Sequence, residues 1–250
     1  MSNADWGLVM SSQYAQLTNV KKFNNLMQYV MHRDPNLPSM VVFYGASGLG
    51  KTTSAIFGAM LSDARYIQVG ASWTKKKLIT EIAKQHGIHD VRTIGSGMEQ
   101  IIDAVNYEPK PIIIDEADYL VAGNMIQLIR EIHDETHCPI VLMGEGQLSM
   151  KLRKYEMVYN RVLKWEQAEK CSIEDTILLA DMYATGLDMA EDLIQALNTN
   201  SDGIARRIVV NTTKIKAAAL GAGIASIDLA KFIELSSFNT ALVPTGGRSV

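Results

Sequence analysis

Apolar residues follow two spacings along this chain, and the pattern changes near residue 170. Up to that point, short apolar runs alternate with segments whose apolar residues recur every three or four positions, as in amphipathic helices. The run Ile112–Ile114 is apolar at every position, as expected of a central parallel strand buried on both faces. Strands that alternate with helices in this way predict a three-layer α/β domain with a parallel sheet.

The elements of this domain can be placed from apolar spacing, helix caps and breakers. The expected strands are 41–43, 64–69, 112–114, 139–143 and 161–165. The expected helices are about 20–31, 53–61, 75–86, 96–106, 124–136 and 147–155.

From Ser172 onward the strand signals stop. Ser172-Ile-Glu-Asp175 is an expected capping box, and helices are expected at about 173–185, 188–198, 203–219 and 226–235. The predicted organisation is an N-terminal helical segment (1–38), the α/β domain (39–168), a small all-helical domain (169–236) and a flexible tail (237–250).

A glycine-rich motif follows the first expected strand and precedes an expected helix. Residues 45–52 fit G-x-x-x-x-G-K-[ST], the loop whose backbone N–H groups cradle phosphates. Lys51 is expected to reach the β- and γ-phosphates, and the Thr52 hydroxyl to bind Mg²⁺. The expected nucleotide contacts are Gly45, Ala46, Ser47, Gly48, Leu49, Gly50, Lys51, Thr52 and Thr53.

Two carboxylates end the apolar run 112–114. Asp115 is expected to hold Mg²⁺ together with Thr52, and Glu116 to take a proton from an attacking water, which predicts a hydrolase. The letters Asp115-Glu-Ala-Asp118 also spell the box of a helicase family. Those helicases need a second recombinase-like domain, which 250 residues cannot hold, so we treat this match as coincidence.

Composition and charge add constraints on the partner and the compartment. Hydrophobic residues make up 47% of the chain and charged residues 20%, which is ordinary for a folded soluble protein. No apolar run is long enough to span a membrane, the N-terminus lacks a basic signal-peptide region, and neither the two cysteines nor the five histidines form a metal pattern. A cytoplasmic protein is expected.

The net charge of −3 argues against a general polyanion binder, but the charges are unevenly distributed. Residues 65–92 hold six Lys or Arg against two acids, whereas residues 99–135 hold two against nine. The basic segment contains Lys75, Lys76 and Lys77 at the start of an expected helix, followed by Arg92 and Thr93 before the next one. No aromatic residues interleave with them, so any DNA contact should be made to the backbone and be nearly independent of sequence. The alternative is a basic helix start that only faces solvent.

Four segments together resemble the AAA+ ATPases of DNA transposition: GASGLGKTT, PIIIDEAD, a strand ending in MGEGQL, and GIARR in the helical region. The chain looks most like the phage Mu transposition protein B family, with its TnsC, TniB and IstB relatives. The similarity covers about residues 15–235. Secretion ATPases of the ExeA type share part of the pattern. The resemblance implies an AAA+ P-loop NTPase domain followed by a helical lid, with ATP and Mg²⁺ as cofactors.

The resemblance also implies roles for residues outside the two nucleotide motifs. Glu145 lies at the sensor 1 position, where the family often has Asn or Thr. Arg206 matches the sensor 2 arginine, which touches the γ-phosphate from the lid. Arg161 matches the arginine finger that completes a neighbouring subunit's site, with Arg153 as the competing candidate. A finger acting between subunits implies a homo-oligomer.

The leading interpretation is an ATP-dependent, non-sequence-specific DNA-binding ATPase that forms a helical filament on target DNA and recruits a transposase, in a bacterial host cytoplasm if the source is a phage or transposon. Hydrolysis would then disassemble the filament. One alternative is an AAA+ loader or secretion-type motor that acts on protein and binds no DNA. A second is a nucleotide-gated interaction module with negligible turnover.

Overall fold

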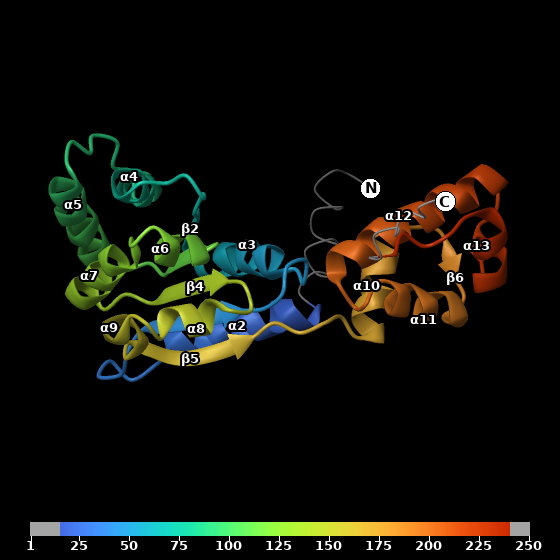
Figure 1. Cartoon of the computed structure of the whole chain (residues 1–250), viewed down its shortest axis with the longest axis horizontal. Coiled ribbons are helices and arrows are strands. Elements are labelled where there is room, and N and C mark those ends of the chain that lie inside the picture. Colours follow the sequence, from blue (N-terminus) through green and yellow to red (C-terminus); the bar gives the residue numbers. More distant parts are fainter. Residues whose placement is uncertain (1–15, 241–250) are drawn as a thin grey trace, which may run out of the picture. The chain divides into compact units, whose positions relative to one another are not determined.

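The structure, a computed structural model, describes residues 16–240 (Figure 1). The chain divides into two compact units. Asn19–Ala168 form the α/β unit. The helical unit takes the described residues from Glu169 onward together with those up to Thr18.

A five-stranded sheet forms the centre of the α/β unit. Its strands are β1 (Met40–Tyr44), β2 (Arg65–Gln68), β3 (Ile112–Asp115), β4 (Ile140–Gly144) and β5 (Val162–Gln167). Their order is β2-β3-β4-β1-β5, and every neighbouring pair is parallel. The predicted parallel sheet with five strands is therefore confirmed.

Helices cover both faces of this sheet. They are α2 (Thr18–Met31), α3 (Lys51–Ser62), α4 (Lys75–Gln85), α5 (Ile94–Tyr107), α6 (Asp118–Ala122), α7 (Ile126–Thr136), α8 (Leu148–Leu152) and α9 (Glu156–Tyr159). Alternate strand residues point to opposite faces. Val42, Ile114 and Leu142 belong to one core cluster with residues of α4, α5 and α7. Phe43 points to the other face, where its ring packs against Phe23 of α2 at a centroid distance of 5.4 Å.

Helix α2 is part of the α/β unit from Asn19 onward, so residues 1–38 are not a separate N-terminal segment as predicted. Its apolar side, which includes Phe23 and Leu26, is fully buried. Gly58 allows α3 to approach this helix, because a Cβ there would lie 2.5 Å from Cε1 of Phe23. Residues 1–15 of the predicted segment lie outside the described residues.

Several predicted helices begin or end elsewhere. The expected helix 147–155 is replaced by two short helices, α8 and α9, and the expected helix 124–136 begins at Ile126. The stretch after Glu116, for which no element was predicted, forms α6. Helix α5 begins at Ile94, earlier than predicted, because Thr93 and Ser96 form a capping box.

The helical unit contains α10 (Ile173–Tyr183), α11 (Glu191–Asn200), α12 (Ala205–Ala222) and α13 (Leu229–Leu235). The predicted capping box at Ser172 and Asp175 is present. The unit is not all-helical, however, because β6 (Asp188–Met189) and β7 (Ser226–Ile227) form a short parallel pair. Two-residue strands leave no detectable alternation in a sequence, and these two were assigned to helices.

Residues 237–240, the described part of the predicted tail, contact the helical unit. The ring of Phe238 packs against Phe232 at a centroid distance of 4.8 Å. The backbone N–H of Asn239 donates to Oδ1 of the buried Asn211 at 2.7 Å. Residues 241–250 lie outside the described part of the chain.

Among the described helices, none is long and apolar enough to cross a membrane.

The parallel arrangement brings the carboxyl ends of β1, β4 and β3 to one edge of the sheet. Two backbone hydrogen bonds join the segments that leave these strands. Gly45 N–H donates to the carbonyl of Gly144 at 3.2 Å, and Ala117 N–H donates to that of Met143 at 2.7 Å. The segments that carry the two nucleotide motifs are thus held beside each other.

Candidate functional site

The glycine-rich loop connects β1 directly to α3, which begins at Lys51. Gly48 and Gly50 have φ values of 83° and 86°, in the left-handed region that glycine adopts without strain. At Gly45 the requirement is space, because a Cβ would lie 3.0 Å from that of Ala168. The loop therefore has the tight backbone path expected of a phosphate cradle, and it leads into the N-terminus of a helix.

Lys51 lies inside this loop. Its ammonium group donates to the carbonyl oxygens of Gly45 and Ala46, both at 2.8 Å. Burial lowers the pKa of Lys51, and the charges of four carboxylates oppose this effect: Asp115, Glu116, Glu145 and Asp118. The ammonium group is thus partly desolvated and lies inside the loop that the motif predicts to bind phosphate.

Asp115 joins the two nucleotide motifs. Its side chain is buried, and its Oδ2 accepts hydrogen bonds from Thr52 Oγ1 at 2.7 Å and from the hydroxyl of Tyr66 at 2.9 Å. Its Oδ1 accepts the N–H of Glu116 at 2.8 Å. A hydroxyl beside a carboxylate is the hard-oxygen donor set that suits Mg²⁺, so these residues fit the metal that the motifs imply.

Glu116 adopts a left-handed backbone conformation with φ of 57°, which is uncommon for a residue with a side chain. Burial raises the pKa of its carboxyl group, and the nearby charge of Asp115 raises it further. Lys51 opposes this effect, whereas Asp118 and Glu145 add to it. A carboxylate whose pKa is raised is a better proton acceptor, as the predicted role requires.

Glu145 follows the last residue of β4 and is exposed. Its charge contributes to the pKa shifts of both Lys51 and Glu116, which places it in the same electrostatic environment. Three acidic residues singled out from the sequence, Asp115, Glu116 and Glu145, thus lie close enough to influence Lys51, and Asp118 is a fourth that the sequence did not single out.

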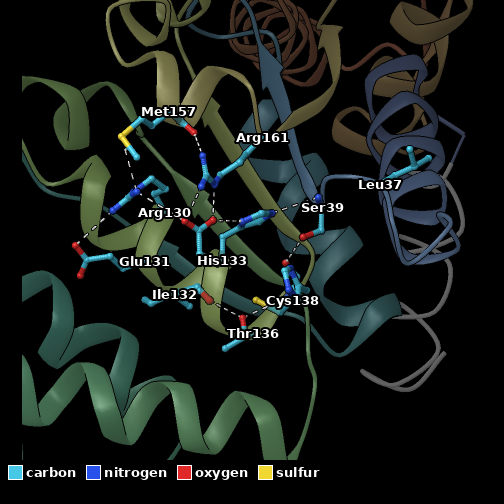
Figure 2. Close-up of polar contacts among 12 residues, drawn as sticks. Leu37, Ser39, Arg130, Glu131, Ile132, His133, Thr136, Cys138, Met157 and Arg161 are labelled. Carbon is cyan, nitrogen blue, oxygen red and sulfur yellow. Dashed lines mark hydrogen bonds and ion pairs between the residues drawn. The ribbon is translucent and has the colours of Figure 1, made fainter.

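The two arginine-finger candidates have different surroundings. Arg161 forms a two-pronged ion pair with Asp134 of α7, in which Nη2 lies 2.7 Å from Oδ2, and it also donates to the carbonyl of Met157 (Figure 2). The same carboxylate accepts from Nδ1 of the buried His133 at 3.1 Å. Arg153, at the end of α8, is exposed, and its guanidinium has no partner among the described residues.

Arg206 is the second residue of α12 in the helical unit and is exposed. Its predicted contact with the γ-phosphate stays a prediction.

The predicted DNA-binding residues lie on α4 and on the connection to α5. Lys76 donates to the carbonyl of Val91 at 2.6 Å, and Lys77 pairs with Glu81 at 2.6 Å. Lys75 is exposed and has no partner among the described residues.

Beyond α4, the side chain of Arg92 pairs with Asp90 at 3.2 Å, and both are well exposed. The Thr93 hydroxyl accepts the N–H of Ser96 at 3.1 Å as the cap of α5. Within the described structure, Lys75 is the one of these five residues whose polar group no internal contact engages.

Residues 35–152 match the sequence model of a family described as an AAA domain. Solved structures with the same fold include the Orc1 protein of Aeropyrum pernix in complex with DNA, at a TM-score of 0.62 and 16% identity. They also include Cdc6p of Pyrobaculum aerophilum (0.63, 15%) and the RuvB Holliday junction branch migration motor of Thermotoga maritima (0.61, 16%). The α/β unit has the AAA+ P-loop NTPase fold.

Each alignment covers 87% of this chain, but 63%, 66% and 67% of the Orc1, Cdc6p and RuvB chains respectively. The chain therefore spans about two thirds of the length of these AAA+ proteins. No curated protein matches the sequence. Among the described residues, no group of three or more His, Cys, Asp or Glu side chains could hold a metal ion.

Tyr66 is a residue of this site that the sequence did not reveal. It lies on β2, where its backbone pairs with Ile113 of β3, and its hydroxyl reaches Asp115. Burial and the charge of Asp115 raise the pKa of the hydroxyl, so it stays protonated and donates. Only the strand order identifies it, because the pattern of residues 64–69 does not say which strand lies next to β2.

Replacing Tyr66 with Phe should weaken Mg²⁺-dependent nucleotide binding by about tenfold, the lower end of the usual cost of losing a hydrogen bond to a metal ligand. A fluorescent nucleotide titrated with Mg²⁺ would measure this. Tyr107→Phe is the matched control, because Tyr107 is 93% exposed. Equal Mg²⁺ dependence in Tyr66→Phe and the wild type would contradict the role of the hydroxyl.

Proposed function

We propose that this chain is an ATPase that assembles on duplex DNA in an ATP-dependent manner and regulates transposition. The observation that carries the ATPase part is the contact of Thr52 with Asp115 beside Glu116 and Lys51. In this proposal Thr52 and Asp115 supply oxygens for the metal, Glu116 is the base and Lys51 is the cation that binds phosphate. The four residues lie in one electrostatic environment.

The geometry supports the following steps. Lys51 would exchange its carbonyl partners for phosphate oxygens, and Thr52 with Asp115 would hold Mg²⁺, which supplies charge neutralisation of the phosphates when bound. Glu116 would accept a proton from water as the water oxygen bonds to the γ-phosphorus. The bond from that phosphorus to the bridging oxygen breaks, and its electron pair stays on ADP.

Glu116→Gln should retain ATP binding and lower turnover by about 100-fold or more, since a positioned base contributes 10²–10⁴. Because Glu116 acts unprotonated and its pKa is raised, wild-type kcat/KM should increase with pH through a value above that of an ordinary glutamate. This acidic limb should be absent in Glu116→Gln. Glu99→Gln, at an exposed position on α5, is the control. Unchanged turnover in Glu116→Gln would show that another residue acts as the base.

A finger acting between subunits is part of this proposal, and the contacts of the two arginines favour Arg153. Arg161 would have to leave Asp134 before it could reach a neighbour. We therefore expect Arg153→Ala to retain nucleotide binding and lose the hydrolysis stimulated by assembly. Mixing it with Lys51→Ala protein should restore part of this activity. At interfaces where an Arg153→Ala subunit supplies the nucleotide site and a Lys51→Ala subunit supplies the finger, both Lys51 and Arg153 are present.

Arg161→Ala and Asp134→Ala supply the comparison for that test. If Arg161 only joins α7 to β5, both changes should lower the melting temperature alike and spare the stimulated ATPase of the folded protein. Absence of that activity in Arg161→Ala but not in Asp134→Ala would instead identify Arg161 as the finger.

The DNA part of the proposal is supported by the resemblance of the motifs to transposition ATPases and by neighbours whose names describe a DNA complex and a branch migration motor. In the described structure Lys75 is the available cation of the basic helix start. The complete proposal is a filament in which Lys75 faces duplex DNA. Its protein partner would be a transposase, and its compartment the cytoplasm.

Lys75→Glu should weaken binding to unrelated duplexes equally, because phosphate contacts carry no base information. Removing the charge in Lys75→Ala should reduce the steepness with which the logarithm of DNA affinity falls with the logarithm of salt concentration. The slope should change by about 0.9 for each phosphate that the lysine neutralises. Lys84→Glu at the far end of α4 is the control. Electron microscopy with ATP should show filaments only with DNA for the wild type, and fewer for Lys75→Glu. Closed rings that ignore DNA would favour the protein-directed motor.

A further inference from the structure

Asp118 is a buried carboxylate beside the candidate site that the proposed chemistry does not use. It is the first residue of α6 and is 8% exposed. Its Oδ2 accepts the backbone N–H of Glu145 at 2.7 Å, and its Oδ1 accepts Nζ of Lys151 at 2.6 Å. One side chain therefore links α6, the end of β4 and α8.

Gly144 makes room for this carboxylate. A Cβ on Gly144 would lie 2.2 Å from Oδ2 of Asp118 and 2.8 Å from Cδ2 of Leu148. The φ of Gly144 is not positive, so the glycine is required for space and not for its backbone conformation. The Asp118 carboxylate thus fills the space where a side chain at the end of β4 would otherwise project.

Two opposed partners fix the orientation of Asp118. Lys151 compensates its charge, and the Lys151 side chain is 39% exposed against 10% for that of Asp118. Each carboxylate oxygen has a different partner, so rotating the group out of this orientation would break both charge-assisted hydrogen bonds. The N–H of Glu145 is consequently held at a defined place relative to the end of β3.

We infer that Asp118 is a positioning residue that holds the turn after β4 so that the Glu145 side chain faces the Glu116 and Lys51 end of the site. The inference rests on the proposed ATP hydrolysis. It also gives a physical reason for the Gly144-Glu145 pair, since the residue at the strand end must be small and the next residue supplies the polar group. The end of β4 lies beside the segment after Glu116, because Ala117 N–H donates to the carbonyl of Met143 at 2.7 Å.

A double-mutant cycle tests this inference. Asp118→Ala should lower kcat by about 10- to 100-fold, the scale of a misplaced catalytic group, and leave the KM for ATP within about twofold. In a Glu145→Gln background the same change should alter kcat by less than about twofold, since the residue it positions is already neutral. Independent, multiplying effects on kcat would overturn the inference.

Gly144→Ala and Gly146→Ala form a matched pair for the same test. Gly144→Ala should reproduce the Asp118→Ala phenotype, because the added methyl group displaces the carboxylate. Gly146→Ala should behave as wild type, because a Cβ there meets nothing within 4 Å. If Asp118→Ala does not fold, Asp118→Asn keeps the volume and an acceptor oxygen and should show a smaller effect.

The hydrogen bond itself can be measured without hydrolysis. The Glu145 amide should be shifted downfield and protected from exchange in the wild type, and should show neither property in Asp118→Ala and Gly144→Ala. If the wild type hydrolyses no ATP, the proposed function fails while this amide signal still decides the positioning contact. An unchanged Glu145 amide in both variants would refute the inference.

Discussion

The hydrogen bond from Thr52 to Asp115 is the contact on which the rest of the site depends. It spans from the start of α3 to the end of β3, so it exists only if the strands between these segments lie parallel and in register. Apolar residues at nearly every position of β1, β3 and β4 keep this central part of the sheet buried. The main contribution of the fold to the candidate site is therefore to fix where β1, β3 and β4 end.

Crowded negative charge is the second constraint. Four carboxylates influence the pKa of Lys51. Three of them raise the pKa of the fourth, Glu116, and Lys51 lowers it. These negative charges would oppose the binding of a polyphosphate unless a divalent cation is bound with it, because like charges at short range repel. The same crowding makes Glu116 a stronger base. The proposed need for a divalent cation and the raised pKa of Glu116 thus have the same cause.

Internal ion pairs decide which basic residues remain available to partners. Arg161, Lys76 and Lys77 each contact a carboxylate or carbonyl of their own chain, whereas Arg153 and Lys75 do not in the described structure. A charged group that already has a partner must give it up before it binds another molecule. Because of this competition, fewer basic residues are expected to contact DNA or a neighbouring subunit than the distribution of charge along the sequence implies.

The sequence alone determined the glycine-rich loop before a helix, the Asp115-Glu116 pair at a strand end and the parallel sheet, because each depends on short-range spacing that physical chemistry restricts to few structures. It did not determine the contacts of Tyr66 and Asp118, the strands β6 and β7, or the packing of Phe238. Those depend on which segments become neighbours in space. Strand order and side-chain competition set them, and neither leaves a local pattern in the chain.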